Sequence, residues 1–179
     1  MPKIQVKRTY LELLSPAELQ PATCGKEGLR LERVAEPAPA LARWLYETVG
    51  AAWHWDDRRG WSDDDWRAEL ARPGVSLHVL YHGTSTIGYF ELAAAAGGEV
   101  EIAYLGLLPG HHGRGYGKHL LTRAAEQAFA SGAHRVWLHT CTLDHPAALA
   151  NYRARGFRPF REELYEAEPA SERPSPTGS

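Results

Sequence analysis

Three short runs of alternating apolar residues, separated by tight turns, constrain this chain more than any other feature. The runs are VSLHVLY at 75–81, TIGYFELAA at 86–94 and VEIAYLGLL at 100–108, and the turns between them are HGTS and AGGE. Alternation of this kind is typical of strands, and turns this short join antiparallel neighbours. The sequence therefore predicts an antiparallel meander of three strands in the middle of the chain.

Helical periodicity before the meander predicts two helices. The first covers residues 40–50, after Pro37 and Pro39, and its apolar face is formed by Leu41, Trp44, Leu45 and Val49. The second begins at Ser62, a preferred N-cap residue, and ends near Pro73. The three aspartates that follow Ser62 are favoured there by the positive end of the helix dipole.

After the meander the pattern changes to helix, strand, helix and strand. A helix is expected from Gly115 to Gly132, and a short buried strand at 135–140. A further helix is expected to be capped by Asp144 and closed by Gly156, followed by a last strand within 157–168. Alternation also predicts two earlier strands, within residues 3–14 and 29–34.

Charge and cysteine content exclude several classes of function. The formal net charge is −2 and the isoelectric point is near 6.5, so nucleic acid and anionic membranes are not expected partners. Cys24 and Cys141 are far apart and neither belongs to a zinc-ligand pattern, so we expect free thiols and no metal. Because neither an export signal nor a membrane span is evident, a cytoplasmic location is the expectation.

The segment LLPGHHGRGYG at 107–117 is the strongest candidate for a binding site. A glycine-rich turn that opens a helix exposes unpaired N–H groups beside the positive helix end, which suits a diphosphate. A tight turn that only allows close packing is the alternative. The segment is neither a Walker loop nor the dinucleotide fingerprint, because G-K-[ST], G-x-G-x-x-G and a surrounding βαβ unit are all missing.

This segment resembles the acetyl-CoA site of the GNAT superfamily of N-acyltransferases, whose motif is Gln/Arg-x-x-Gly-x-Gly/Ala. Here the motif is His112-Gly113-Arg114-Gly115-Tyr116-Gly117, with His112 in the place of Gln or Arg. A second motif also matches, because Ala148, Tyr152, Gly156 and Phe157 stand at the family's spacings. His145 occupies the position where the family usually has Asn, beside the pantetheine arm of the cofactor.

The resemblance implies a mixed α+β GNAT fold, with a mostly antiparallel sheet that is splayed where acetyl-CoA enters, flanked by helices and extended by an extra N-terminal strand. It implies a domain at 29–167, an N-terminal extension of strand and loop at 1–28 packed on it, and a tail at 168–179. The tail is expected to be disordered because it lacks apolar residues.

The resemblance also implies roles for single residues. The N–H of Leu107, at a bulge near the end of its strand, would bind the acetyl carbonyl. Tyr152 would donate a proton to the leaving sulfur, since the pKa of a phenol lies near that of a thiol. Glu101 stands where related histone acetyltransferases carry their catalytic glutamate, so it is the candidate base, with His139 as the alternative.

The segment WHWDDRRGWSDDDW at 53–66 holds four of the six tryptophans and five of the six aspartates. In the GNAT family this region usually forms a wall of the acceptor site, which implies that Trp53, Trp55 and Asp56 bind a cationic amine. Helix capping, local pairing of Asp56 and Asp57 with Arg58 and Arg59, and apolar packing explain the same composition without a substrate. A contact in a homodimer is a third interpretation.

The resulting hypothesis is acetyl transfer from acetyl-CoA directly to a primary amine of a small cationic metabolite. Two alternatives stay open: a protein-lysine acetyltransferase, and a non-catalytic module that binds acyl-CoA or another protein.

Overall fold

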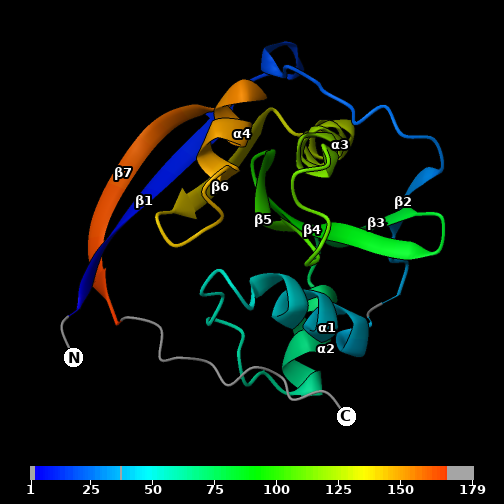
Figure 1. The fold of residues 1–179 in the computed structure, drawn as a ribbon, viewed down its shortest axis with the longest axis horizontal. Coiled ribbons are helices and arrows are strands. Elements are labelled where there is room, and N and C mark those ends of the chain that lie inside the picture. Colours follow the sequence, from blue (N-terminus) through cyan, green and yellow to red (C-terminus); the bar gives the residue numbers. More distant parts are fainter. Residues whose placement is uncertain (1–2, 37, 169–179) are drawn as a thin grey trace.

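The predicted meander forms the centre of the molecule. In the computed structural model, which describes residues 3–36 and 38–168, β3 (Val75–His82), β4 (Ser85–Ala95) and β5 (Glu99–Leu107) are antiparallel neighbours. They belong to a seven-stranded sheet in the order β2-β3-β4-β5-β6-β1-β7 (Figure 1). The mixed α+β architecture expected from the sequence is confirmed.

The sheet opens between its two central strands. After β5 the chain forms α3 (Tyr116–Ala130) and returns as β6 (Arg135–Cys141), which is parallel to β5. The two strands pair only along Glu99–Glu101 and Arg135–Trp137 and then diverge. All other strand pairs are antiparallel, so the predicted splayed sheet is confirmed at this point.

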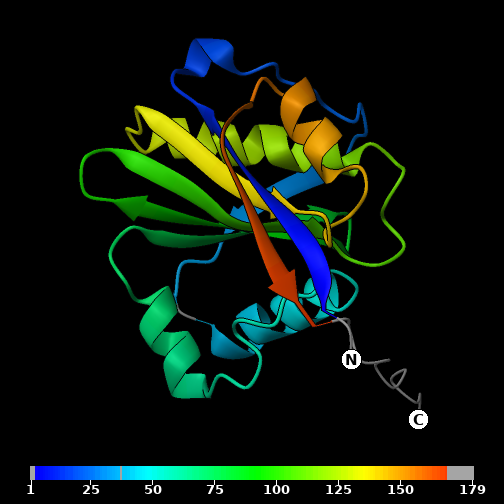
Figure 2. The same cartoon turned by 90° about the vertical axis from the view of Figure 1, so that its left-hand side faces the viewer.

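The first and last strands of the chain complete one side of the sheet. β1 (Ile4–Leu13) lies between β6 and β7 (Arg158–Ala167) and is antiparallel to both (Figure 2). A short 3₁₀ turn, η1 (Pro16–Glu18), leads away from β1, and β2 (Leu29–Arg33) forms the opposite edge beside β3. The N-terminal extension therefore contributes an interior strand of the same sheet.

Helices cover the two faces of the sheet and bury separate apolar clusters. α3 and α4 (Ala148–Ala154) lie on one face, and the apolar cluster there includes Leu11 and Phe90 of the sheet and Leu120 of α3. α1 (Pro39–Gly50) and α2 (Asp63–Leu70) lie on the other face (Figure 1). Leu45, Tyr46, Val49, Trp66 and Tyr89 belong to the second cluster.

Helix α2 begins as its sequence predicts. The Ser62 side chain accepts a hydrogen bond from the N–H of Asp65, and the Asp65 carboxylate accepts one from the N–H of Ser62. This reciprocal capping satisfies two otherwise free donors at the helix end. In α1, Pro39 occupies the first turn, where its missing N–H costs nothing.

Two predicted details of the helices are wrong. Trp44 is 45 % exposed, because the buried face of α1 is formed by Ala42, Leu45, Tyr46 and Val49. Asp144 does not cap α4, which begins only at Ala148; its carboxylate instead accepts hydrogen bonds from the Cys141 N–H and the Thr140 hydroxyl. The predicted tail lies outside the described residues beyond Glu168, as does Pro37.

Candidate functional site

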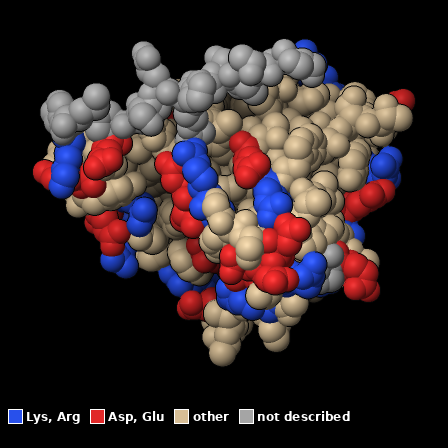
Figure 3. Space-filling view, turned by 90° about the horizontal axis from the view of Figure 1, so that it is seen from below, with Lys and Arg blue, Asp and Glu red and all other residues tan. Residues whose placement is uncertain are grey.

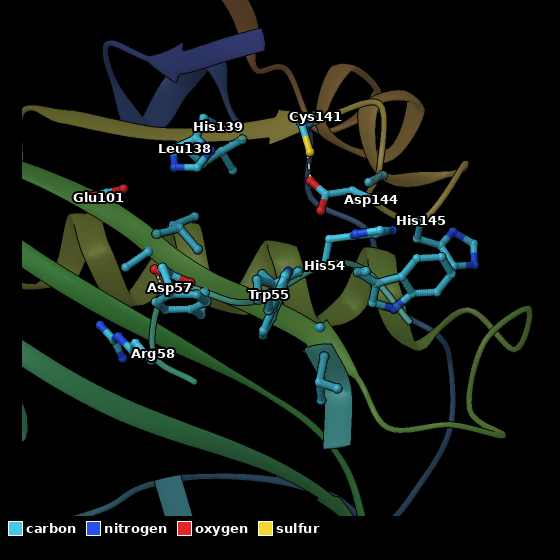
Figure 4. A pocket seen from close by; sticks show the side chains of 18 of the residues that line it. His54, Trp55, Asp57, Arg58, Glu101, Leu138, His139, Cys141, Asp144 and His145 are labelled. Carbon is cyan, nitrogen blue, oxygen red and sulfur yellow. Dashed lines mark hydrogen bonds between the residues drawn. The ribbon is translucent and has the colours of Figure 1, made fainter. Parts of the chain in front are cut away.

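A cavity of about 590 Å³ lies where β5 and β6 diverge. It is lined by the loop after α1, by β5 and β6, by the turn before α4, and by parts of β1 and β7 (Figure 4). Eight residues predicted for the site line it: Trp53, Trp55, Asp56, Glu101, Leu107, His112, His145 and Tyr152. Segments from distant parts of the sequence therefore meet in one place.

The glycine-rich turn has the form of an anion cradle at one end of this cavity. Gly113 and Gly115 have φ values of 73° and 84°, and Gly115 is the N-cap of α3. Within the described part of the chain, the N–H groups of His112, Gly113 and Gly115 have no hydrogen-bond acceptor. A Cβ added at Gly113 would meet no atom within 4 Å, so open space lies beside this backbone. The turn therefore fits the diphosphate of acetyl-CoA.

The remaining residues of this motif take different positions. Arg114 is exposed, and Gly117 is half-buried at the start of α3. Tyr116 is buried, and its hydroxyl lies 2.7 Å from His82 Nδ1. The Tyr116 ring therefore packs in the interior, and only the backbone of this residue belongs to the cradle.

The two histidines that depart from the family motifs lie against each other. The rings of His112 and His145 are stacked, with centroids 4.8 Å apart and an interplanar angle of 6°. Trp53 contacts both in edge-on geometry, at 6.2 Å from His112 and 5.0 Å from His145. Burial, followed by the charges of His145 and His111, lowers the pKa of His112. One tryptophan thus joins the loop after α1 to both sequence motifs.

The expected bulge lies elsewhere on β5. The register between β4 and β5 shifts so that Ala103 is the extra residue, opposite the Glu91–Leu92 step, whereas Leu107 pairs regularly with Gly88. The prediction of a bulge at Leu107 is therefore wrong. The Leu108 N–H bonds to Ile87 of β4, so by the alternation of backbone groups the Leu107 N–H points toward the gap beside β6.

Glu101 lies at the point where β5 leaves β6 and faces the cavity (Figure 4). Its carboxylate has no hydrogen-bond or ion-pair partner among the described residues. Burial, and then the charge of Glu91, raises its pKa, and Arg58 opposes the shift. A carboxylate that is partly desolvated and otherwise unused is suited to accept a proton.

Tyr152 of α4 lies across the cavity from β5 and is 8 % exposed. Burial, followed by the charge of Asp144, raises the pKa of its phenol well above the ordinary value. The expectation that its pKa lies near that of a thiol is therefore wrong for this environment. The hydroxyl is fully protonated at neutral pH, as a proton donor must be.

Two further groups of β6 face the same cavity. His139 lies beside Leu138 and opposite Glu101 (Figure 4), and burial followed by the charge of Arg8 lowers its pKa. Burial, and then Asp144, raises the pKa of the Cys141 thiol, which therefore does not favour a thiolate nucleophile.

Two tryptophans of the tryptophan-rich segment pack around one buried arginine. Arg58 is 7 % exposed, and its guanidinium donates to both carboxylate oxygens of Glu91, at 2.7 and 2.8 Å. The rings of Trp61, Trp66 and Tyr104 surround it at 4.8, 5.4 and 4.4 Å. These two tryptophans are therefore accounted for by packing.

The two aspartates that precede Arg58 have different partners. Asp56 pairs with Arg59 at 2.7 Å, as the sequence predicts. Asp57 does not pair with an arginine but accepts hydrogen bonds from the hydroxyls of Tyr46, at 2.6 Å, and Tyr104. The predicted Asp57–arginine pairing is wrong because Arg58 turns inward to Glu91.

Trp55 both packs and lines the cavity. Its ring contacts Tyr46, Tyr89 and Tyr104, with centroids 5.6, 6.4 and 5.0 Å apart. A Cβ at Gly50 would lie 2.5 Å from Trp55 Cβ, so only glycine lets α1 approach this closely. Sequence reasoning missed Asp57, Tyr104 and the Arg58–Glu91 pair, because these partners are separated by more than thirty residues.

The described residues show no arrangement typical of a metal site or of a membrane-spanning helix. Residues 3–36 and 38–168 contain no group of three or more His, Cys, Asp or Glu arranged to hold a metal ion. No helix in that part of the chain is long and apolar enough to cross a membrane. On the face seen from below, basic and acidic side chains are interspersed (Figure 3).

Comparison with known proteins identifies the family. The protein-family model described as "Acetyltransferase (GNAT) family" matches residues 39–157 of this chain. Uncharacterised N-acetyltransferases of Mycobacterium bovis and Mycobacterium tuberculosis are 31 % identical over 96 residues, which cover 51 % of this chain and 62 % of theirs. The matched part thus spans less than two thirds of these relatives.

Solved structures share the fold. A GCN5-related N-acetyltransferase from Kribbella flavida has a TM-score of 0.65 and 20 % identity, over 92 % of this chain and 59 % of that one. An aminoglycoside acetyltransferase from an uncultured soil metagenomic sample has a TM-score of 0.62 and 18 % identity, over 73 % and 88 %. With the family pattern covering both motifs and the fold agreeing, this chain belongs to the acetyltransferase (GNAT) family of acyltransferases.

Proposed function

We propose that this protein transfers an acetyl group from acetyl-CoA directly to the primary amine of a small cationic molecule. The observation that carries the proposal is that Glu101 and Tyr152 line one cavity from opposite sides, next to the open glycine-rich turn. Among the structural relatives, an aminoglycoside acetyltransferase acts on a small molecule with amino groups.

The cofactor would be held by the backbone of the turn. The free N–H groups of His112, Gly113 and Gly115 would bind its diphosphate, and His145 would lie along the pantetheine arm. Acetyl-CoA supplies the acyl thioester. The Leu107 N–H, which points into the gap between β5 and β6, would donate to the thioester carbonyl and stabilise charge that develops there.

Proton transfers would be divided between two residues. Glu101, whose pKa is raised by burial, would take the proton of the attacking aminium directly or through a water molecule. The amine nitrogen then forms its bond to the carbonyl carbon as the carbon–sulfur bond breaks. Tyr152 would give its proton to the departing sulfur, and the second proton that the nitrogen loses on becoming an amide would restore the tyrosine hydroxyl.

The charge of the cavity favours a cationic acceptor. Five carboxylates line it, those of Asp56, Asp57, Glu69, Glu101 and Asp144, against three guanidiniums. Trp53 and Trp55 add aromatic faces, each of which attracts a cation by about 0.5–2 kcal/mol. Trp53, Trp55 and Asp56 are therefore the proposed acceptor contacts.

The test is thiol release from acetyl-CoA with a panel of polyamines, amino acids, aminoglycosides and lysine peptides. Turnover of a small amine that falls by about 10²-fold or more in both Glu101→Gln and Tyr152→Phe would support the proposal. Acetylation of peptides alone would favour a protein-lysine acetyltransferase. Thermal stabilisation by acetyl-CoA without turnover of any amine would favour a binding module.

A further inference from the structure

We propose that Arg8 binds a carboxylate of the acceptor, so that the preferred substrate carries both a primary amine and a carboxylate. This inference rests on the proposed acetyl transfer and names the chemical class of the acceptor. It concerns a wall of the cavity that comes from β1 and β7, outside the residues matched by the family pattern.

Arg8 is placed in the cavity by the register of the sheet. It lies opposite Cys141 in the β1–β6 ladder, and both residues line the cavity together with Tyr165 of β7. The guanidinium carbon is 4.8 Å from the centre of the Tyr165 ring, so the group rests against an aromatic side chain. The planar fork of a guanidinium is suited to bidentate binding of a carboxylate.

The charge of Arg8 is poorly compensated within the protein. Glu163 is the one carboxylate close enough for an ion pair among the described residues, and that contact is 3.9 Å long. Glu163 accepts hydrogen bonds from the Tyr10 hydroxyl, at 3.0 Å, and from Arg161, so it is already engaged. Tyr10 and Tyr165 also interact with the guanidinium, but both are neutral groups.

One donor of Arg8 is left without any partner. Its Nε is buried and makes no hydrogen bond to any described residue, and a buried donor of this kind loses its bond to water without replacing it. A ligand carboxylate on the exposed part of the side chain would compensate the charge of the group. The side chain is 34 % exposed, so it is accessible from the cavity.

The other two arginines of the cavity are already paired with carboxylates of the protein, which leaves Arg8 as the candidate for a ligand carboxylate. Arg58 and Arg72 both bond to Glu69, and Arg58 also bonds to Glu91, so neither offers a free charge. Glu101 has no hydrogen-bond or ion-pair partner within residues 3–36 and 38–168, and it faces the cavity from β5. An amine at Glu101 and a carboxylate at Arg8 would therefore each meet an uncompensated opposite charge.

The experiment uses pairs of acceptors that differ by one carboxylate: lysine and cadaverine, ornithine and putrescine, β-alanine and ethylamine. We expect kcat/KM to be at least about 10-fold higher for the carboxylated member of a pair that is turned over. In Arg8→Gln that preference should be lost, through a rise in KM for the carboxylated member of about 10-fold or more. The decarboxylated member should change by less than about 3-fold.

Two further variants separate binding from structure. Arg8→Lys keeps the charge but not the planar fork, so it should retain part of the preference. Lys7→Gln is the matched control, because Lys7 is the neighbour of Arg8 on β1 but pairs with Glu162 and does not line the cavity. Its preference should equal that of the wild type.

Different failures have different meanings. Equal kcat/KM within every pair, or an equal loss for both members in Arg8→Gln, would overturn the role of Arg8 and leave acetyl transfer standing. Absence of turnover with all amines would overturn the proposed function and this inference with it.

Discussion

Arg58 and Glu91 form a buried ion pair with two hydrogen bonds, at 2.7 and 2.8 Å, that ties the loop after α1 to the central strand β4. Their side chains are 7 % and 2 % exposed. The pair holds the backbone between Trp55 and Trp61 against the sheet and so positions one wall of the cavity. It also lies beside Glu101, whose pKa responds to both charges.

Removing one partner of this pair should be far more costly than removing both. Arg58→Met leaves the buried Glu91 without its ion-pair partner, and Glu91→Leu leaves Arg58 with only the longer contact to Glu69, at 3.4 Å. For either variant we expect the free energy of unfolding to fall by about 3–5 kcal/mol. The double variant should recover most of that loss. Urea unfolding of the four proteins at pH 7 measures it, and additive losses in the double variant would contradict the expectation.

Trp53 should matter more for the cofactor than for the stability of the fold. It contacts the stacked rings of His112 and His145, and such aromatic contacts contribute about 0.5–1.5 kcal/mol each. Trp53→Leu is therefore expected to raise KM for acetyl-CoA by roughly 3- to 10-fold. Trp44→Leu, which replaces an exposed tryptophan on α1, is the control and should leave that KM unchanged.

The acidic limb of the pH–rate profile should report Glu101. A base must be unprotonated to act, so kcat/KM should fall as the pH drops through the pKa of Glu101. Since burial and Glu91 raise that pKa, the limb should lie above the range of an ordinary glutamate, which is near 4.3.

Glu101→Gln removes the group that this limb would report. The residual rate of the variant should be low and should lack the limb. A limb that persists unchanged would instead assign the base to His139, which faces the same cavity.

His78 should make the fold less stable in acid. Its ring is 4 % exposed, stacks on Phe90 at 4.7 Å and lies 3.0 Å from the Ser76 hydroxyl, and burial followed by Arg33 lowers its pKa to about 4. The native state therefore keeps this ring neutral while the unfolded chain takes up a proton below about pH 6.5.

The stabilising contribution of His78 is thus complete above pH 6.5 and is lost as the pH falls toward 4. We expect a loss of up to about 3 kcal/mol over that window. His78→Phe, which does not titrate, should lose correspondingly less stability than the wild type between pH 7 and pH 4.5 in urea unfolding. Equal losses in the two proteins would show that His78 does not contribute.

Local sequence patterns predict the helices and strands, but they do not predict contacts between residues that are far apart in the chain. The Ser62 cap could be predicted because its partner Asp65 is three residues away. The sequence predicts Asp144 as the cap of α4, but α4 begins only at Ala148. The Asp144 carboxylate instead accepts a hydrogen bond from the Cys141 N–H at the end of β6. Periodicity located α1, but it did not show that Tyr46 rather than Trp44 faces the sheet.

The site was predictable where a motif fixes the backbone and unpredictable where tertiary contacts decide. The glycine motif predicted a tight turn, and Gly113 and Gly115 have the positive φ values of one, because spacing along a turn is a local property. Tyr152 of the second motif lines the cavity. The bulge at Ala103 depends on how β5 aligns with β4, and Arg8 enters the cavity only because β1 is inserted beside β6. Neither relationship can be predicted from a few neighbouring residues of the sequence.

The position of β1 also has a consequence for how the chain is made. β1 leaves the ribosome long before the two strands to which it is hydrogen-bonded, since its neighbours are β6 and β7. Until those strands emerge, β1, whose Val6, Leu11 and Leu13 are fully buried in the folded protein, has neither of its hydrogen-bonded partners. The nascent chain therefore carries an unpaired apolar strand while the segments from β2 to α3 are made, a stage at which binding to a chaperone would protect it from pairing with other chains.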